Sequence, residues 1–281
     1  MNITRFAPSP TGRLHLGHAF SAVLGQNRAR ESGGRFLVRI EDLDQTRSKS
    51  EFVDAIFDDL RWLGLEWAPP LLIQSQRTSA YQAALQGLRA AGLVYACFCT
   101  RSDMGSALEA PHGNAVMRYP GSCRELPDDA GRRAKQPHSW RLDAGKALER
   151  TGLPSWIEEG RRWTATPDQF DDVILARKDA PAAYHLACVV DDAASGVDLI
   201  VRGADLRPST PIQRLLQLLH GMPEPSYLHH SLVAHSDGRR LAKRDRAPTL
   251  HAMREAGVDG RALAADLGAG KLPLGFTFLE A

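Results

Sequence analysis

Residues 5–19 read RFAPSPTGRLHLGHA and join the end of a β-type run to the start of a helical one. Residues 2–7 predict a short strand, the Pro/Gly-rich segment 8–12 predicts a turn, and residues 14–30 predict a helix. The run RFLVRI at 35–40 then predicts a second strand. Strand, glycine-containing turn, helix and strand within about forty residues form the βαβ unit of a nucleotide-binding sheet. The expected fold class is therefore α/β, with a Rossmann-type parallel sheet.

Further periodic runs predict the remaining elements. Helices are expected at 49–63, 77–91 and 211–219, and strands at 94–99, 172–176, 184–190 and 197–202. The segment up to residue 165 is rich in Gly, Pro and charge, and it is interpreted as an irregular insertion. The expected division is a first half of the Rossmann fold at 1–96, an insertion with a zinc subsite at 97–165, a second half at 166–235, and a basic loop with a short helical tail at 236–281.

The composition is that of an ordinary globular protein, with 43% hydrophobic and 24% charged residues, and it argues against a disordered or fibrous chain. The N-terminus lacks a basic stretch followed by an apolar run, so no signal peptide is expected. No apolar segment approaches the ~20 residues that cross a bilayer, so a cytoplasmic enzyme without a membrane partner is expected. A net charge of +2 does not by itself indicate a nucleic-acid partner.

The motif His15-Leu16-Gly17-His18 lies at the turn between the first strand and its helix. Histidines three residues apart project to the same side of a helix, and Gly17 lets a nucleotide approach the backbone. The helix N-terminus adds N–H groups and a partial positive charge. These features suit an anionic triphosphate, because fixed donors stabilise the negative charge that develops on it. A pair of surface histidines is the alternative interpretation of the motif alone.

A basic motif, RRLAKRD, occupies residues 239–245. A mobile lysine that closes over ATP can stabilise charge on the phosphates, and Lys243 is placed for this. A basic surface loop is the alternative interpretation. The value of the motif comes from its partner, because the histidine pair begins the predicted sheet and the lysine follows its last strand and helix.

The order of these two motifs resembles the class I aminoacyl-tRNA synthetases, with HLGH as the first signature and RLAKR as the second. Residues 5–19, RIEDLDQTR at 39–47 and the stretch 189–213 narrow the resemblance to the glutamyl/glutaminyl branch. It implies an ATP-dependent, AMP-forming ligase that uses ATP with Mg²⁺. The implied catalytic residues are His15, His18 and Lys243, and the implied ATP-binding residues are His15, Gly17, His18, Arg240 and Lys243. The second signature departs from the family, which usually has lysine where Arg240 stands and serine where Ala242 stands.

A glutamate pocket needs separated positive groups and at least one anion, because glutamate carries two carboxylates and one ammonium. Arginine binds a carboxylate through two hydrogen bonds, which makes Arg5 and Arg202 candidates, and Glu41 at a strand end could hold the ammonium. The resemblance places the glutamate site at these positions together with Ala7, Pro8, Ser9 and Tyr184. A surface arginine, a core tyrosine and a solvated strand-end glutamate are the structural alternatives.

The chain has four cysteines, too few for a disulfide framework in a chain of this length. Three of the four lie in one short segment, and this spacing points to a metal. They are Cys97, Cys99 and Cys123. Thiolates are strong zinc ligands and tetrahedral zinc needs a fourth, for which general zinc chemistry offers His112 or His138. The resemblance implies Tyr119 instead, and hence one structural Zn²⁺ with four protein ligands. Three reduced cysteines without metal are the alternative.

Two departures from the glutamyl-tRNA synthetases of translation indicate which RNA accepts the glutamyl group. The stretch after Arg244 is too short for their anticodon-binding region, and Ala204 stands where they commonly have glutamate. Both departures resemble the glutamyl-queuosine tRNA(Asp) synthetases, the stand-alone catalytic-core paralogues. The resemblance implies tRNA-independent activation of L-glutamate and its transfer to queuosine, at the wobble position in the anticodon loop of tRNA(Asp), by a monomer. The alternatives are a truncated glutamyl-tRNA synthetase that charges a tRNA 3′ end, a catalytically silent ATP- or RNA-binding paralogue, and a small-molecule adenylylating ligase.

Overall fold

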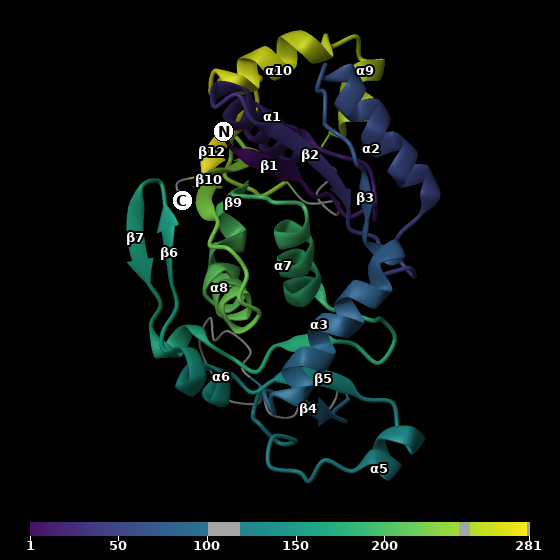
Figure 1. Cartoon of the computed structure of the whole chain (residues 1–281). Coiled ribbons are helices and arrows are strands. Elements are labelled where there is room, and N and C mark those ends of the chain that lie inside the picture. The colour runs from purple at the N-terminus through teal and green to yellow at the C-terminus, as the bar shows by residue number, and fades with distance from the viewer. Residues whose placement is uncertain (101–118, 242–247, 280–281) are drawn as a thin grey trace.

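Two adjoining, mainly parallel sheets from distant parts of the chain form one central layer of the protein (Figure 1). The structure is a computed structural model, and it describes residues 1–100, 119–241 and 248–279. In the first part, β1 (Ile3–Phe6), β2 (Arg35–Ile40) and β3 (Leu72–Ile73) pair in parallel, with Ile3 opposite Arg35 and Arg39 opposite Leu72. Helix α1 (Leu16–Glu31) connects β1 to β2, and α2 (Ser50–Trp62) follows β2. The predicted βαβ unit is confirmed.

The second part contributes β6 (Ser155–Glu158), β9 (Leu199–Gly203) and β10 (Ser226–His230), which pair in parallel in the order β6-β10-β9. Strand β7 (Arg161–Thr164) adds an antiparallel edge. The two parts meet where the Asp198 N–H donates to the Ile3 carbonyl over 3.1 Å, so β9 lies beside β1. The chain thus leaves β1 toward β2 on one side and returns to β9 on the other, which makes this junction a switch point where such sheets bind ligands.

Helices cover both faces of the sheet, and β2 shows why. Its Leu37 packs into one core cluster, whereas Phe36, Val38 and Ile40 pack into another. Alternate side chains of a strand point to opposite faces, so both faces of β2 are buried, as expected for a parallel strand. The first cluster includes residues of α3 (Thr78–Ala90), α7 (Tyr184–Ala194) and α8 (Thr210–Leu219), and the second includes residues of α1, α2 and the C-terminal helices.

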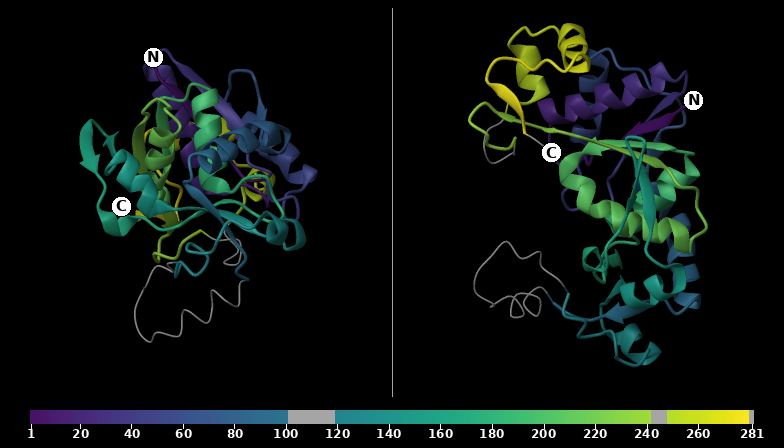
Figure 2. Two further views of the ribbon diagram at one scale, coloured as in Figure 1. Left: turned by 60° about the horizontal axis from the view of Figure 1, so that its bottom comes forward. Right: turned by 90° about the vertical axis from the view of Figure 1, so that its left-hand side faces the viewer.

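The remaining elements lie at the two ends of the molecule (Figure 2). At one end, β4 (Val94–Cys97), β5 (Ser139–Leu142) and β8 (Ile174–Ala176) form a small antiparallel sheet. Helices α5 (Ala130–Lys135) and α6 (Ala144–Thr151) flank β5 in the chain. At the other end, α9 (Leu250–Glu255) and α10 (Gly260–Gly268) precede β12 (Phe276–Leu279), which pairs with β11 (Leu232–His235). Three short 3₁₀ helices, η1 (Gln74–Arg77), η2 (Pro167–Gln169) and η3 (Ala204–Ser209), complete the described elements.

Two expectations from the sequence are wrong. The run at 184–190 is not a strand but the first part of α7, which continues to Ala194. A short apolar run cannot be assigned to a buried strand or a buried helix by its periodicity alone. Residues 130–164 are not irregular, since they form α5, β5, α6, β6 and β7, and β6 joins the central sheet through β10.

Within residues 1–100, 119–241 and 248–279, none of the helices combines the length and the apolar character needed to cross a bilayer.

Candidate active site

A cleft of about 500 Å³ opens at the junction of β1 and β9. Its lining comes from the end of β1, the loop and first turn of α1, the residue after β2, the start of α7, the ends of β9 and β10, and β11 with its following loop. It brings together these residues predicted from the sequence: Arg5, Ala7, Pro8, Ser9, His15, Gly17, His18, Glu41, Tyr184, Arg202 and Arg240. Lys243, the remaining predicted residue of this site, lies outside the described residues.

The two histidines are fixed by the helix start that they build. The Nδ1 of His15 accepts the Gly17 N–H over 3.1 Å, and the Nδ1 of His18 accepts the His15 N–H over 3.1 Å. Each neutral ring therefore carries its proton on Nε2, because the accepting nitrogen is unprotonated. The ring centroids lie 3.8 Å apart. The histidines thus cap α1 and present Nε2–H donors as one unit.

Gly17 has a structural role that the sequence did not reveal. A Cβ at this position would lie 3.1 Å from Cε1 and 3.3 Å from Nδ1 of His15. Such contacts are tighter than ordinary van der Waals packing, so any other residue would displace the His15 ring. The glycine protects the capping geometry as well as leaving room for a ligand.

A buried ion-pair network holds the glutamate-binding candidates Arg5 and Glu41. The Nε of Arg5 donates to Oδ1 of Asp192 over 2.9 Å, and Arg39 donates to the same oxygen. The Nη2 of Arg39 donates to Oε1 of Glu41 over 2.9 Å. Burial alone would raise the pKa of Asp192, but Arg39 and Arg5 hold that pKa at about 2. Asp192 is therefore a permanent anion that orders both arginines.

Glu41 responds differently to the same surroundings. Burial raises its pKa, and the attraction of Arg39 only partly opposes this shift. A carboxylate whose ionised form is destabilised by burial gains from a cation placed beside it. The geometry therefore suits Glu41 to a ligand ammonium in the cleft.

Arg39 and Asp192 are the members of this network that the sequence analysis missed. Both are buried, with 3% and 2% of their surface exposed. The signal was present, because each is a charged residue within or next to an apolar run, RFLVRI and CVV. Charged side chains are almost never fully buried unless they are paired, so such placements predict a buried ion pair.

Two further glutamate candidates, Tyr184 and Arg202, line the cleft from α7 and β9. Tyr184 opens α7 and is 36% exposed, so it is not the core residue that was one alternative. Arg202 is 4% exposed and donates to neutral acceptors on His229, Gln213 and Thr210. Arg5, at 6% exposure, is likewise not a surface arginine. The two arginines reach the same cleft from neighbouring strands.

The side of the cleft near β11 contains a polar pair that was not predicted. The Oγ of Ser21 and Nε2 of His230 lie 2.6 Å apart, and Nδ1 of His230 lies 3.0 Å from the Ser231 carbonyl. Arg240, two residues before the undescribed segment, forms a bridge with Ala234 of β11. On the far side of that segment, Thr249 forms a bridge with His15, and the Leu250 N–H donates to the Leu14 carbonyl over 2.9 Å.

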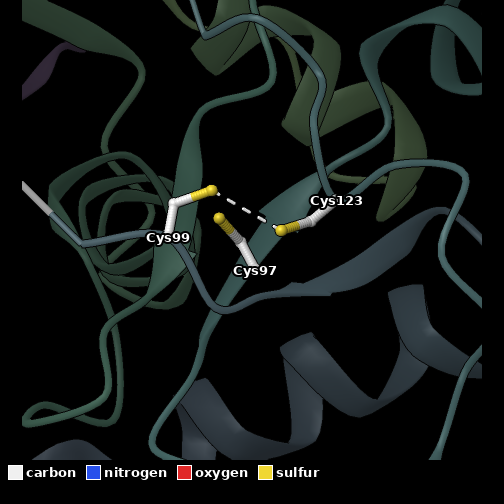
Figure 3. Close-up of side chains that lie close together, drawn as sticks. All are labelled: Cys97, Cys99 and Cys123. Carbon is white, nitrogen blue, oxygen red and sulfur yellow. Dashed lines mark hydrogen bonds between the residues drawn. The ribbon is translucent and has the colours of Figure 1, made fainter. Parts of the chain in front are cut away.

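The three predicted cysteines form one cluster at the end of β4 (Figure 3). Their sulfur atoms all lie within 4.8 Å of one another, with Cys99 and Cys123 3.6 Å apart. The Tyr119 hydroxyl lies 3.4 Å from the Cys97 sulfur and 3.5 Å from the Cys99 sulfur, and it accepts the Cys123 N–H over 2.9 Å. His112 lies outside the described residues, and the ring of His138 instead packs against Phe98 and Trp140.

These separations fit a tetrahedral ion. Zinc–sulfur bonds of about 2.3 Å and zinc–oxygen bonds of about 2.0 Å, at tetrahedral angles, place sulfurs about 3.8 Å apart and sulfur and oxygen about 3.5 Å apart. The separation of Cys99 and Cys123, and both sulfur–oxygen distances, are close to these values. The donor set could therefore hold a metal ion.

Comparisons with known proteins show the family of the chain. A family model described as "tRNA synthetases class I (E and Q), catalytic domain" matches residues 2–268. A glutamyl-Q tRNA(Asp) synthetase of Rhodobacter capsulatus is 45% identical over 91% of this chain and 96% of its own. Another from Nocardia farcinica is 48% identical over 90% of this chain and 79% of its own.

A solved structure shows the same similarity in three dimensions. Glutamate-tRNA synthetase from Elizabethkingia anophelis matches with a TM-score of 0.75 and 26% sequence identity, over 87% of this chain. This chain spans about half of that enzyme, 53% of its length.

Proposed function

This chain belongs to the class I tRNA synthetases for glutamate and glutamine, a family of ligases, and we propose that it activates L-glutamate with ATP and transfers it to queuosine in the anticodon loop of tRNA(Asp). The observation that carries the proposal is the cleft, because a set of glutamate-binding candidates and a histidine-capped helix start line one cavity. The names of the relatives support the choice of acceptor. The proposal includes that the protein acts in the cytoplasm as a monomer.

In the first step, a glutamate α-carboxylate oxygen attacks the α-phosphorus of ATP, the bond to the bridging oxygen breaks, and pyrophosphate leaves. Arg5, Arg202 and Glu41 hold the carboxylates and the ammonium, with Ala7, Pro8, Ser9 and Tyr184 completing the pocket. The Nε2–H groups of His15 and His18 donate to the phosphate as its negative charge grows. Arg240 and Lys243 stabilise the same charge from the second signature, and Mg²⁺ arrives with ATP as part of the substrate.

In the second step, a queuosine hydroxyl attacks the acyl carbon of glutamyl-adenylate, and AMP leaves with the electron pair of the broken anhydride bond. The hydroxyl proton is lost to solvent or to the departing phosphate. The chain's part in this step is to hold the glutamyl group through the same pocket and so to fix the acyl carbon for attack.

Cys97, Cys99, Tyr119 and Cys123 would hold one structural Zn²⁺. Four protein ligands fill a tetrahedral shell, so the ion would supply cross-linking of this end of the fold and no reaction chemistry. This role suits the cluster, because it joins the end of β4 to Tyr119 and Cys123, which follow residues 101–118.

Charging of a tRNA 3′ end is the second candidate function. It is favoured by one observation, the similarity to a solved glutamate-tRNA synthetase. Both functions share the first step and differ only in the nucleophile that accepts the acyl group.

Acceptor choice separates the two functions. The enzyme is incubated with ATP, labelled glutamate and either queuosine-containing tRNA(Asp), queuosine-free tRNA(Asp) or tRNA(Glu). We expect label on the first RNA only, and glutamate-dependent ATP–pyrophosphate exchange without any tRNA. Equal labelling of queuosine-free tRNA(Asp) or of tRNA(Glu) would rule out the proposed acceptor, and an absence of exchange would favour a catalytically silent protein.

A further inference from the structure

A chain of buried polar side chains runs across three neighbouring strands to the cleft. It consists of Glu158 on β6, His229 on β10 and Arg202 on β9, each about 4% exposed. In the strand register, His229 stands opposite Arg202, and Glu158 stands opposite Tyr227, two residues before His229. Residues two apart on a strand share a face, so the sheet itself brings the three side chains together.

The hydrogen bonds define how the chain is protonated. The Nε–H of Arg202 donates to Nε2 of His229 over 3.1 Å. Arginine offers donors only, so Nε2 is unprotonated and the ring proton lies on Nδ1. This Nδ1 lies 3.0 Å from Oε1 of Glu158, close enough for electrostatic attraction but not aligned as a hydrogen bond within the described residues. Burial and the charge of Arg202 lower the pKa of His229 to about 4, which keeps the ring neutral.

The far end of the chain is anchored as an anion. Glu158 forms an ion pair with the guanidinium of Arg207, at 3.0 Å. The indole N–H of Trp156 donates to Oε2 over 3.3 Å, and Nε of Arg207 donates to Oε1 over 3.0 Å. An ionised Glu158 therefore attracts the Nδ1 side of the imidazole, and the Nε2 of the imidazole accepts the hydrogen bond of the arginine.

Arg202 differs from Arg5 in what surrounds its charge. Three of its five N–H groups go to neutral acceptors, Nε2 of His229, Oε1 of Gln213 and Oγ1 of Thr210. Among residues 1–100, 119–241 and 248–279, no carboxylate forms an ion pair with it. Arg5, by contrast, is paired directly with Asp192. A buried guanidinium held by neutral partners keeps its full attraction for an incoming carboxylate.

We infer that Glu158 and His229 are positioning residues, which fix the guanidinium of Arg202 so that its two remaining N–H groups receive one carboxylate of the glutamate substrate. The inference rests on the proposed function. A neutral imidazole between the two charges explains how the arginine is oriented without being neutralised. If the carboxylate of Glu158 touched Arg202 directly, it would compete with the substrate.

The test uses steady-state ATP–pyrophosphate exchange with four single variants of the full chain. His229→Leu removes both the acceptor and the donor, His229→Gln can supply both, and Glu158→Gln removes the anchoring charge. Glu224→Gln is the matched control. Glu224 also pairs with a buried arginine, Arg214 of α8, at 3.3 Å, but it does not line the cleft.

We expect His229→Leu to raise the KM for glutamate about tenfold or more, since an oriented hydrogen bond to a charged group is lost. The KM for ATP should change less than about twofold, and His229→Gln should recover most of the glutamate affinity. Glu158→Gln should lie between these two variants. The control should leave both KM values near those of the wild type.

Urea unfolding of each variant separates positioning from folding. If His229→Leu does not fold, Glu158→Gln and His229→Gln still report the KM for glutamate. The inference would be overturned by an unchanged KM for glutamate in both His229→Leu and Glu158→Gln, or by an equal rise of the KM values for glutamate and ATP in these variants. A wild-type enzyme without glutamate-dependent exchange would instead refute the proposed function.

Discussion

The glutamate end of the cleft and the cysteine cluster both gather chemically demanding groups, but they balance charge differently. In the cleft, Asp192 lies between Arg5 and Arg39, so the chain supplies its own counter-charges. In the cluster, three thiols and the Tyr119 hydroxyl face one another, and a divalent cation would balance the thiolates that form when it binds. The cleft is therefore formed by folding alone, whereas we propose that the cluster is completed by an ion.

The largest effect should come from breaking the charge balance of the cleft. Asp192→Asn leaves Arg5 and Arg39 buried without their shared anion, which should lower the free energy of unfolding by about 3–5 kcal/mol. Urea unfolding at pH 7 measures this loss. Asp44→Asn is the control, because the pKa of Asp44 is also lowered to about 2 but the side chain is only half-buried and is paired with the exposed Arg47. A loss for Asp44→Asn as large as that for Asp192→Asn would contradict this explanation.

The pH dependence of Asp192 follows with a definite sign. Its pKa is about 2 in the folded protein and about 3.9 in an unfolded chain. The unfolded state thus binds more protons in this range, so the contribution is complete above about pH 4 and is lost as pH falls toward 2. Below pH 4, the free energy of unfolding of the wild type should therefore fall more steeply with decreasing pH than that of Asp192→Asn.

A second effect concerns catalysis at the other end of the cleft. His18→Asn keeps an acceptor near the position of Nδ1 for the His15 N–H, but it removes the Nε2–H donor. Adenylate formation should fall about 100-fold, as for the loss of one fixed donor to a developing charge. Lys243→Ala should cause a comparable fall. The unfolding midpoint of His18→Asn should stay near that of the wild type, and undiminished ATP–pyrophosphate exchange would refute the role of the histidine pair.

A smaller effect is expected at a carboxylate that the chain leaves uncompensated. Asp59 on α2 is 1% exposed, and neither of its oxygens has a hydrogen-bond partner in the part of the chain that the structure describes. Burial raises its pKa to about 6, although Arg254 and Arg13 oppose the shift. The folded state therefore binds more protons than the unfolded state between about pH 4 and 6, and this group lowers the free energy of unfolding as pH rises through that window.

Asp59→Asn should accordingly stabilise the protein by about 2 kcal/mol at pH 7.5 and have little effect at pH 4. Urea unfolding at the two pH values measures the difference. The neighbouring Asp58, exposed and paired with Arg61 over 3.2 Å, provides the control Asp58→Asn. Equal stabilisation by Asp59→Asn at both pH values would show that burial of the charge is not the cause.

The smallest effect on activity should come from the cysteine cluster. Cys99→Ser should abolish binding of about one equivalent of zinc and make residues near the cluster more sensitive to proteolysis. Cys188, a buried cysteine of α7 outside the cluster, provides the control Cys188→Ser, which should retain the metal. Adenylate formation by Cys99→Ser should change less than about threefold, because a four-ligand structural ion offers no position for chemistry. Metal analysis, limited proteolysis and exchange assays measure these outcomes. A protein purified without bound metal that also takes up none would favour three reduced cysteines.

The sequence predicted the parts of the fold that depend on local pattern. The bounds of β2 were predicted residue for residue, and the ends of α2 and α3 to within one residue, because their periodicity is regular. The helix at α7 was missed because its apolar run lacks a polar face, as its buried residues from Leu186 to Asp192 show.

In the candidate site too, residues within local motifs could be predicted, whereas contacts between distant segments could not. Residues within motifs, such as His15 and Glu41, could be predicted to line it. The contact of Glu158 with His229 joins positions far apart in the chain, and no local pattern in the sequence indicates that β6 lies beside β10. Asp59 was missed for a related reason, since its burial depends on packing between distant parts of the chain.

The two bridges that flank the second signature set a geometric limit on its lysine. Arg240 is fastened to Ala234, and Thr249 is fastened to His15. Lys243 lies three residues after one anchor and six before the other, so its Cα is within about 11 Å of the first and about 22 Å of the second, whatever path the backbone takes. Both ends of the second signature are thus fixed beside the cleft, and lengthening the segment between them by a few residues should weaken the proposed stabilisation of ATP by Lys243.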